Sequence, residues 1–365
     1  MLMVFFLKNY CIIVSSVRTV IMNSFIRLFL TLFLVLSSMK SLAQDPHFSQ
    51  FYANPMYLNP SYTGLNYCPT WVVNYRNQWP ALPGDYVTYN TSVDFGVQEV
   101  HGGFGLIALH DNAGSGVLKT TNISLLYSYH NYLSSTTLLT AGVQFGYFQR
   151  KLDTDHFFGD QIDELYGFIY PTGDDLANQA YWNVSYTDLS AGIALTMDKY
   201  WGGLAVHHLT EPSYAFLDAN NTGKLPMKMT LHGGSIVFIK DLGWLNNSFL
   251  SRFSAFKPHF IFQKQGQSEQ LNIGANLDGE KLGLGLAYRR GFNNSDAIII
   301  LMGYEFTQSA STAFFQKIRI GYSYDLTVSN LGISSGGSHE ISIRMQLPCI
   351  IKSPGLSPIP CPQLF

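Results

Sequence analysis

The sequence predicts an all-β protein, a transmembrane antiparallel β-barrel of about 14 strands with a short N-terminal extended segment. Charged residues make up only 13% of the chain and aromatic residues 15%, whereas an average soluble domain carries roughly 25% charged residues. After Ala43 the chain has no run of about 18 uncharged apolar residues, which disfavours membrane-spanning helices. From Trp71 onward it breaks into alternating apolar and polar segments of about ten residues, long enough to cross a bilayer as tilted strands.

The N-terminus has the features of a secretory signal peptide, assigned to residues 1–43. Arg27 supplies a positive start, an apolar core follows, and Ser41-Leu42-Ala43 provides a small-residue cleavage site. Residues 1–21 lie either upstream of the true start at Met22 or within an extended signal. We expect the whole stretch to be missing from the mature protein.

The mature chain falls into three expected parts. Residues 44–70 form an extended, turn-rich segment, because Asn54-Pro55 and Asn59-Pro60 exclude the residue before each proline from the helical region. This segment either plugs the barrel lumen or is a loose periplasmic lead-in to the first strand. Residues 71–347 form the barrel, and residues 348–365 form a periplasmic tail.

Three cysteines remain after the signal peptide, Cys68, Cys349 and Cys361. In an oxidising compartment a disulfide would join Cys349 to Cys361 across a short proline-rich tail, or Cys68 to Cys349 across the barrel seam. A third alternative is that no pair forms. The sequence leaves these alternatives open.

The segment from Lys317 to Leu326 shows the strand pattern most clearly. Ile320 and Tyr322 fall on one face and Ser323 and Asp325 on the other, so a barrel would place the first pair in lipid and the second in the lumen. An even number of strands is expected when both chain ends lie on the periplasmic side. Similar segments predict fourteen strands, near 71–78, 87–98, 102–111, 120–133, 136–151, 182–197, 200–210, 227–240, 252–264, 268–278, 281–291, 296–307, 314–328 and 338–347.

This division predicts that the connections differ between the two ends of the barrel. Residues 134–135, 198–199 and 279–280 would be tight turns at one end, whereas residues 153–181 and 211–226 would be long loops at the other. Short periplasmic turns and long extracellular loops are typical of outer-membrane barrels. The 153–181 loop is also acidic, which indicates either a solvated surface or a partner-binding one.

No catalytic residue, cofactor or metal site is expected. His110-Asp111 and Asp155-His156 lie at predicted loop edges, and the neighbours His207 and His208 point to opposite sides of a strand. The net charge of −2 provides no basic stripe for nucleic acid. These observations disfavour nucleic-acid binding and give no support to an enzyme.

Four separated motifs resemble those of the PorP/SprF family of type IX secretion system membrane proteins. They are QDPHFSQFYANPMYLNPSYTG from Gln44 to Gly64, YRNQWP from Tyr75 to Pro80, YSYDLTVSNLG from Tyr322 to Gly332 and GSHEISI from Gly337 to Ile343. The resemblance spans nearly all of the mature chain. It implies an outer-membrane barrel of Bacteroidetes-type bacteria, associated with protein export to the cell surface or with gliding motility.

Within these motifs we expect structural or partner roles rather than catalysis. Alternation points Arg76 and Gln78 inward, where Arg76 would form a structural salt bridge with a lumen carboxylate such as Asp94. Glu340 and His339 would lie at the rim, with turn and girdle roles. The motif residues are Asn59, Pro60, Tyr62, Gly64, Arg76, Gln78, Trp79, Asp325, Gly337, His339 and Glu340.

The resemblance implies an accessory that helps secrete or attach specific large proteins, of the gliding or adhesin type, at the surface. Its expected partners are outer-membrane lipid, a secreted substrate with a C-terminal sorting domain, and other type IX components. The alternative is a passive diffusion channel for small solutes, because one fold serves several functions. A plugged lumen would favour the first reading and an open bore the second.

Overall fold

The computed structural model describes residues 45–114, 117–152, 162–163, 166–168, 173, 183–216, 223–241, 253–291, 295–308, 314–329 and 332–349. The predicted signal peptide and most of the predicted C-terminal tail lie outside these residues, so both stay predictions. Among the described residues, no helix is long and apolar enough to cross a bilayer.

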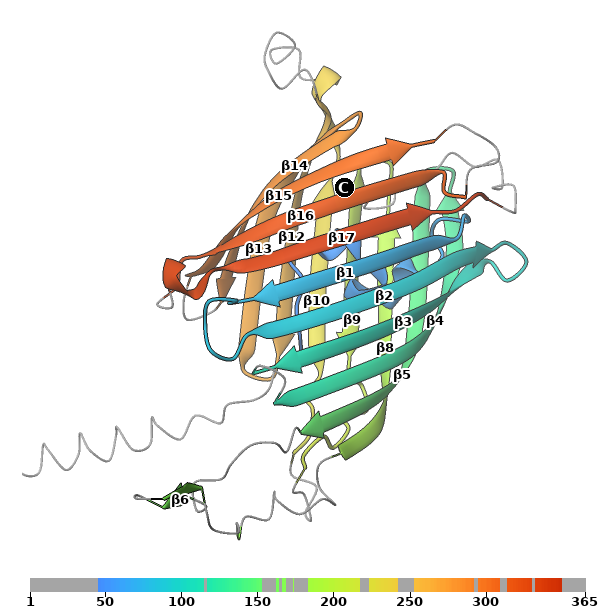
Figure 1. Cartoon of the computed structure of the whole chain (residues 1–365). Helices are drawn as coiled ribbons and strands as arrows, with labels where there is room; N and C mark the ends of the chain where they lie inside the picture. The colour runs from blue at the N-terminus through green and yellow to red at the C-terminus, as the bar shows by residue number, and fades with distance from the viewer. Residues whose placement is uncertain are drawn as a thin grey trace, which may run out of the picture. The chain divides into compact units, whose positions relative to one another are not determined.

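The described part of the mature chain is a closed antiparallel β-barrel (Figure 1). Its sheet has fifteen strands when the two-residue β11 (Val237–Phe238) is counted and fourteen without it. Among the fourteen, each strand pairs with its neighbours in sequence, including β10 with β12 across the short β11, and the pairing of β1 with β17 closes the ring. The fourteen are β1 (Thr70–Gln78), β2 (Tyr86–Val97), β3 (Gly102–Ala113), β4 (Leu118–Ser134), β5 (Thr137–Leu152), β8 (Asn183–Thr196), β9 (Tyr200–His207), β10 (Lys228–Ser235), β12 (Phe253–Gln265), β13 (Ser268–Gly279), β14 (Leu282–Gly291), β15 (Ser295–Thr307), β16 (Lys317–Thr327) and β17 (Ser338–Gln346).

All fourteen predicted strands are confirmed, with differences at their ends. β9 ends at His207 and not at residue 210, because His208 and Glu211 adopt positive φ angles of 60° and 41° that end a strand. The predicted strand 227–240 is broken after Ser235 into β11 and a 3-10 turn, η6 (Ile239–Asp241). A small hairpin of β6 (Ile162–Asp163) and β7 (Gly167–Phe168) was not predicted.

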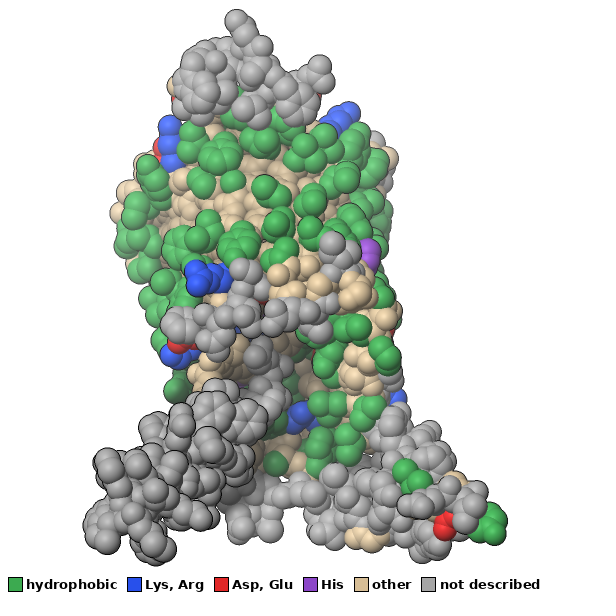
Figure 2. Space-filling view, turned by 90° about the vertical axis from the view of Figure 1, so that its left-hand side faces the viewer, with side chains coloured by type: hydrophobic (Ala, Val, Ile, Leu, Met, Phe, Trp, Pro, Cys, Tyr) green, Lys and Arg blue, Asp and Glu red, His purple; other side chains and the backbone are tan. Residues whose placement is uncertain are grey.

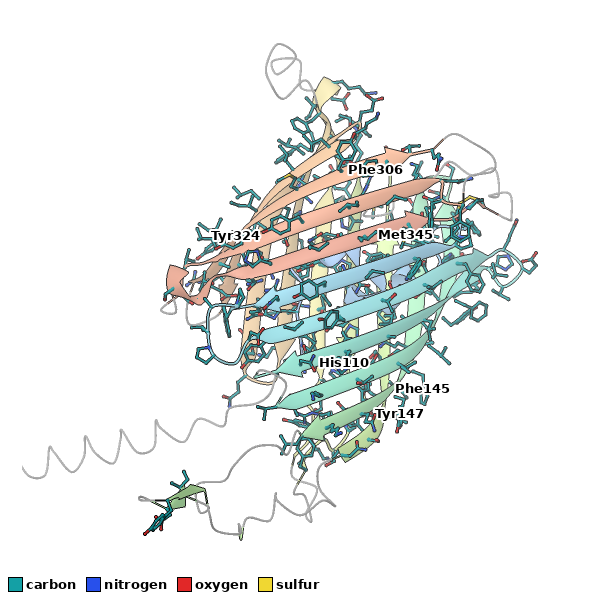
Figure 3. All side chains as sticks on the ribbon, viewed as in Figure 1. His110, Phe145, Tyr147, Phe306, Tyr324 and Met345 are labelled. Atoms are coloured by element: carbon teal, nitrogen blue, oxygen red, sulfur yellow. A yellow bond between two sulfur atoms is a disulfide. The ribbon has the colours of Figure 1, made fainter. Side chains whose placement is uncertain are left out.

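Apolar side chains cover the outside of the barrel and polar ones line its lumen. On β16, Ile320 and Tyr322 are exposed while Ser323 and Asp325 are buried, as the alternation predicts. Phe145 and Tyr147 of β5 point away from the wall (Figure 3), and about half of each side chain is exposed. On the face shown in Figure 2, hydrophobic side chains spread over the wall with few charges among them. This outer surface suits lipid.

The ends of the barrel differ in their connections. We call the end where β1 begins and β17 finishes the terminal end, and the opposite end the loop end. The tight turns after β4, β8 and β13 lie at the terminal end, and the long connections 153–182 and 208–227 lie at the loop end, as predicted. The connection from β10 to β12, residues 236–252, departs from this pattern because it is long and lies at the terminal end.

A disulfide joins Cys68 to Cys349 at the terminal end, where β1 and β17 meet. The adjacent backbone supports it, because the Leu347 N–H donates to the Pro69 carbonyl at 2.9 Å. The pairing across the barrel seam is therefore the correct alternative. It leaves Cys349 unavailable to Cys361, which lies outside the described residues.

Candidate functional site

Residues 45–66, here called the lumen segment, lie inside the barrel (Figure 1). The segment contains η1 (Phe51–Ala53), α2 (Pro55–Leu58) and η2 (Pro60–Tyr62), so the expectation of an extended chain is wrong for residues 51–62. Both prolines open a helical turn, a position where the missing N–H costs nothing. The residues before them, Asn54 and Asn59, do avoid helical angles as expected.

The lumen segment runs from one end of the barrel to the other. At the loop end the Asp45 N–H donates to the Gln265 side-chain oxygen at 3.1 Å, and Gln265 is the last residue of β12. At the terminal end the Gly64 N–H donates to Asp94 at 2.8 Å, and Asp94 lies opposite Thr70, the first residue of β1. The segment therefore runs lengthwise through the lumen before the chain enters the wall.

A buried charge cluster holds Ser49 near the loop end. Its members are Ser49, Arg76, Arg289, Asp325 and Glu340, from the lumen segment and strands β1, β14, β16 and β17. Arg76 lies 2.9 Å from Asp325 and 3.2 Å from Glu340, and Arg289 lies 2.9 Å from Asp325. The Ser49 hydroxyl donates to Asp325 at 2.6 Å and accepts from both guanidinium groups, at 2.9 and 3.0 Å.

Glu340 also anchors the backbone of the lumen segment. Its two carboxylate oxygens accept the N–H groups of Ser49 and Gln50, at 2.6 and 3.1 Å. The Gln50 side chain then donates to the Glu340 backbone carbonyl at 3.0 Å and accepts from the Ser342 hydroxyl at 2.6 Å. Glu340 is 0% exposed, so the expected rim and girdle role is wrong for it. It lies on the lumen face because alternation places it opposite to its neighbour His339.

His339 lies on the outer face, where its ring nitrogen is 2.9 Å from the Tyr322 hydroxyl and its ring contacts Tyr324. That placement agrees with the expected girdle role. Trp79 adopts a positive φ of 58° where the chain leaves β1, and its N–H donates to the Gly337 carbonyl at 2.8 Å. The hydrogen bond from Trp79 to Gly337 therefore links the β1–β2 connection to the β16–β17 connection at the loop end.

The expected pairing of Arg76 with Asp94 is wrong. Both side chains point into the lumen, but Arg76 lies opposite Thr88 while Asp94 lies opposite Thr70. Thr88 and Asp94 are six residues apart on β2, so Arg76 and Asp94 are separated by roughly 20 Å along the strand direction. Asp94 instead accepts the N–H of Gly64, whose φ of +65° and contact with Gly103 require a glycine. Gln78 lies beside the Arg76 guanidinium at 3.5 Å.

Asn59 fixes the middle of the lumen segment. Its side-chain amide donates to the carbonyls of Ile193 and Leu204, at 3.1 and 3.4 Å, and its oxygen accepts the Ser61 N–H at 3.0 Å. The wall provides room for it through Gly192 and Gly203, because a Cβ atom at either would collide with the Asn59 amide.

The neighbours of Asn59 pack against the wall in the same way. Pro60 lies where a Cβ at Gly142 would be, and the Tyr62 ring packs on His232 with centroids 5.3 Å apart. The glycines of the wall therefore leave the space that the lumen segment occupies.

A second ionic site holds Asp45 at the loop end. The His208 ring lies 2.8 Å from Asp45 and 3.0 Å from Asp188, and the Lys228 ammonium lies 3.6 Å from Asp45. Burial alone would lower the pKa of His208, but the two carboxylates outweigh it and raise the pKa to about 9. Burial would likewise raise the pKa of Asp45, but His208 and Lys228 hold it well below its usual range.

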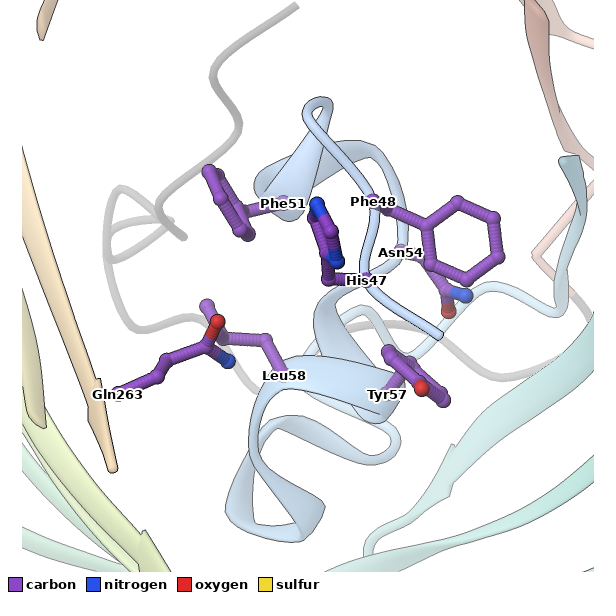
Figure 4. A pocket seen from close by; sticks show the side chains of 7 residues that line it. All are labelled: His47, Phe48, Phe51, Asn54, Tyr57, Leu58 and Gln263. Atoms are coloured by element: carbon purple, nitrogen blue, oxygen red, sulfur yellow. The ribbon is translucent and has the colours of Figure 1, made fainter. Parts of the chain in front are cut away.

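The segment packs closely at its loop-end half (Figure 4). A cavity of about 10 Å³ lies there, lined by His47, Phe48, Phe51, Asn54, Tyr57, Leu58 and Gln263. A second cavity, of about 30 Å³, adjoins Asp45 and Lys228. Each has room for one or two water molecules.

Sequence reasoning did not single out Asp45, Ser49, Gln50 or Asp188. Its expectation that His207 and His208 point to opposite sides of a strand is wrong, because β9 ends at His207 and both side chains are buried with ring centroids 6.5 Å apart. Ser49 and Gln50 lie within the first quoted motif but outside any periodic segment, so alternation carried no signal for them. Among the described residues, no group of three or more His, Cys, Asp or Glu side chains is arranged so that it could hold a metal ion.

Three solved structures show weak similarity to this chain. The Pseudomonas putida toluene transporter TodX is 8% identical with a TM-score of 0.43, over 84% of this chain and 95% of that one. A Pseudomonas aeruginosa FadL homologue is 11% identical with a TM-score of 0.42, over 77% and 90%. The Acinetobacter baumannii protein Omp33 is 6% identical with a TM-score of 0.40, over 78% and 99%.

No curated protein matches the chain. The sequence profile of the family described as type IX secretion system membrane protein PorP/SprF matches residues 40–345, which is most of the chain and nearly the whole barrel. The four motifs and the barrel geometry agree with that match. The chain is thus an outer-membrane β-barrel and belongs to the PorP/SprF family of type IX secretion system membrane proteins.

Proposed function

We propose that this protein is a non-enzymatic accessory of the type IX secretion system that assists secretion or surface attachment of specific large proteins, of the gliding or adhesin type. The observation that carries the proposal is the seated lumen segment. Its contacts reach strands on opposite sides of the ring, including β1, β2, β8, β12 and β17. A barrel whose lumen holds such a segment supports a function carried out by the rim and the loops rather than by transport through the lumen.

The contacts also oppose release of the segment. Withdrawing Ser49 and Gln50 would strip the buried Glu340 carboxylate of two backbone donors. Leaving a buried charge without its partners costs several kcal/mol. The alternative role is a passive diffusion channel for small solutes. To open such a channel, the segment would have to leave the lumen at that cost in free energy.

The loop end offers a surface that suits a protein partner. Arg150 of β5 donates to the Tyr214 carbonyl at 2.9 Å and lies 4.5 Å from the centre of the Tyr214 ring, which ties the 208–227 connection to the wall. On the β6–β7 hairpin, Tyr166 is 77% exposed and Ile162 52%. Exposed apolar side chains that lie close together in the chain support a role in partner binding. The partners would be a substrate with a C-terminal sorting domain and other type IX components.

Deletion of the gene tests the proposal. We expect one cognate protein to disappear from the cell surface while the other type IX exports remain, as measured by quantitative proteomics of the surface fraction. Complementation with the wild-type gene should restore that protein. An unchanged surface proteome contradicts the proposal, and loss of every export would indicate a core component of the system.

Conductance distinguishes the channel alternative. In planar bilayers we expect little steady conductance from the wild-type barrel and a large increase when residues 45–64 are deleted. Replacing those residues by a Gly-Ser chain of equal length is the control, because it keeps the length but not the contacts and should also conduct. A large conductance from the wild-type protein would favour the channel.

A further inference from the structure

The outer wall carries a hollow where lipid-facing side chains are missing. In the paired register, Leu195 of β8 lies beside Gly202 of β9, Gly202 beside Gly233 of β10, Gly233 beside Phe260 of β12, and Phe260 beside Ile273 of β13. Two adjacent strands therefore present glycine between large apolar neighbours. The hollow has a volume of about 790 Å³. It spans two strands that lack large outward side chains, which corresponds to a width of about 10 Å.

The hollow is a groove that follows β10 toward the terminal end. Leu231 lines the end of the groove that is nearer the loop end of the barrel. Gly233 and Ser235 form the floor of the groove. Tyr200 and Leu195 form one wall, and Phe260, Pro258 and Ile273 form the other. Its lining is mostly apolar and faces the membrane.

Charges of both signs gather where the groove reaches the terminal end. The Lys199 and Lys240 ammonium groups lie 5.7 and 5.5 Å from the centre of the Phe238 ring. Asp241 lies 3.4 Å from Lys199, and both side chains are about half exposed. Asp198 is also exposed there. Two ammonium groups thus lie near the Phe238 ring, one of them beside the Asp241 carboxylate, and Asp198 precedes Lys199 in the same turn.

We propose that this groove binds one phospholipid with a zwitterionic headgroup, of the phosphatidylethanolamine class. An acyl chain lies along Gly202, Gly233 and Ser235. The phosphate faces Lys199 and Lys240, and the ammonium faces Asp198 and Asp241. A headgroup with both charges matches a cluster with both charges, whereas a purely anionic one would meet the two carboxylates. With both chain ends periplasmic, the site lies in the periplasmic leaflet.

The shape of the groove favours a lipid over a protein partner. A neighbouring barrel presents a convex wall, which cannot fill a concavity two strands wide. A hollow lined by apolar side chains within a bilayer also excludes water. A flexible acyl chain meets both conditions.

Native mass spectrometry in nonionic detergent tests the proposal, with phosphatidylethanolamine as the probe. Gly202→Leu would fill the groove, and the space permits it because a Cβ there meets only the His232 carbonyl oxygen, at 3.5 Å. We expect one bound lipid per wild-type protein and roughly tenfold weaker binding by the variant, the factor that follows when about two methylene groups lose their contacts. Ala141→Leu, an exposed small-to-large change on β5, is the matched control and should bind as the wild type does.

The headgroup half of the site has its own test. Lys199→Gln with Lys240→Gln should weaken binding of phosphatidylethanolamine but not of diacylglycerol, which has no phosphate. Equal binding by Gly202→Leu and Ala141→Leu overturns the groove, and equal binding of the two lipids by the wild type overturns the headgroup assignment. If Gly202→Leu fails to migrate as a folded barrel, Ser235→Leu fills the same groove and replaces it.

Discussion

Arg76 in the first strand and Glu340 in the last lie directly opposite each other across the seam where the barrel closes, and their side chains meet in the lumen at 3.2 Å. The same two side chains reach the lumen segment through Ser49. Closure of the wall and seating of the segment therefore depend on one buried ionic site. Because neither side chain is more than 2% exposed, solvent does not screen the pair.

Glu340→Ala should destabilise the barrel strongly. It leaves Arg76 with one carboxylate fewer and removes the acceptor for the Ser49 and Gln50 N–H groups, a change that typically costs about 3–5 kcal/mol. Unfolding by urea in detergent measures the loss. Glu269→Ala is the control, because its partner Lys264 is half exposed, so solvent screens the pair and it should contribute less than about 1 kcal/mol. Similar losses for the two variants would contradict the assigned role of Glu340.

The site around His208 predicts a pH dependence with a definite sign. Its folded pKa of about 9 lies above the ordinary value of 6.5, so its contribution is full below pH 6.5 and is lost as pH rises through 9. A shift of this size corresponds to at most roughly 3 kcal/mol. Unfolding free energy should therefore fall between pH 6 and pH 9.5 in the wild type and change less in His208→Gln. A steeper dependence in the variant would count against this site.

The Cys68–Cys349 disulfide should stabilise the barrel by closing a very long loop. The two cysteines are 281 residues apart, and loop-closure entropy alone gives an upper bound of about 5 kcal/mol. We expect Cys68→Ser and reduction with dithiothreitol to lower the urea midpoint equally. Cys361→Ser should leave both the bridge and the midpoint unchanged, and a lowered midpoint there would indicate a different pairing.

Gly192→Ala should loosen the lumen segment. The added Cβ would occupy the position of the Asn59 side-chain oxygen, and overpacking of this kind costs about 1–3 kcal/mol. Limited proteolysis between Asp45 and Gly64, together with urea unfolding, reports the effect. Gly202→Ala on the outer face is the matched control, since its Cβ would make only an ordinary contact. Equal protection of the segment in both variants would argue against a tight fit at Asn59.

The alternation of side chains was enough to predict the strands, because it reflects only which face meets lipid and which meets the lumen. It assigned Ile320 and Tyr322 outward and Ser323 and Asp325 inward, and the structure agrees. It also assigned Arg76 and Gln78 inward. Alternation carries no information on height along the barrel axis, so it paired Arg76 with Asp94, about 20 Å away.

The sequence by itself determined the barrel, its fourteen strands, the faces of those strands and the family, since each rests on local pattern or on motif order. Only the tertiary structure decided that the lumen segment lies inside the barrel, that Cys68 bonds to Cys349, and that Arg76 meets Glu340. Those outcomes depend on which distant strands become neighbours and at what register the ring closes. Closure brings together residues more than 250 positions apart, such as Arg76 and Glu340, a proximity that no local pattern encodes.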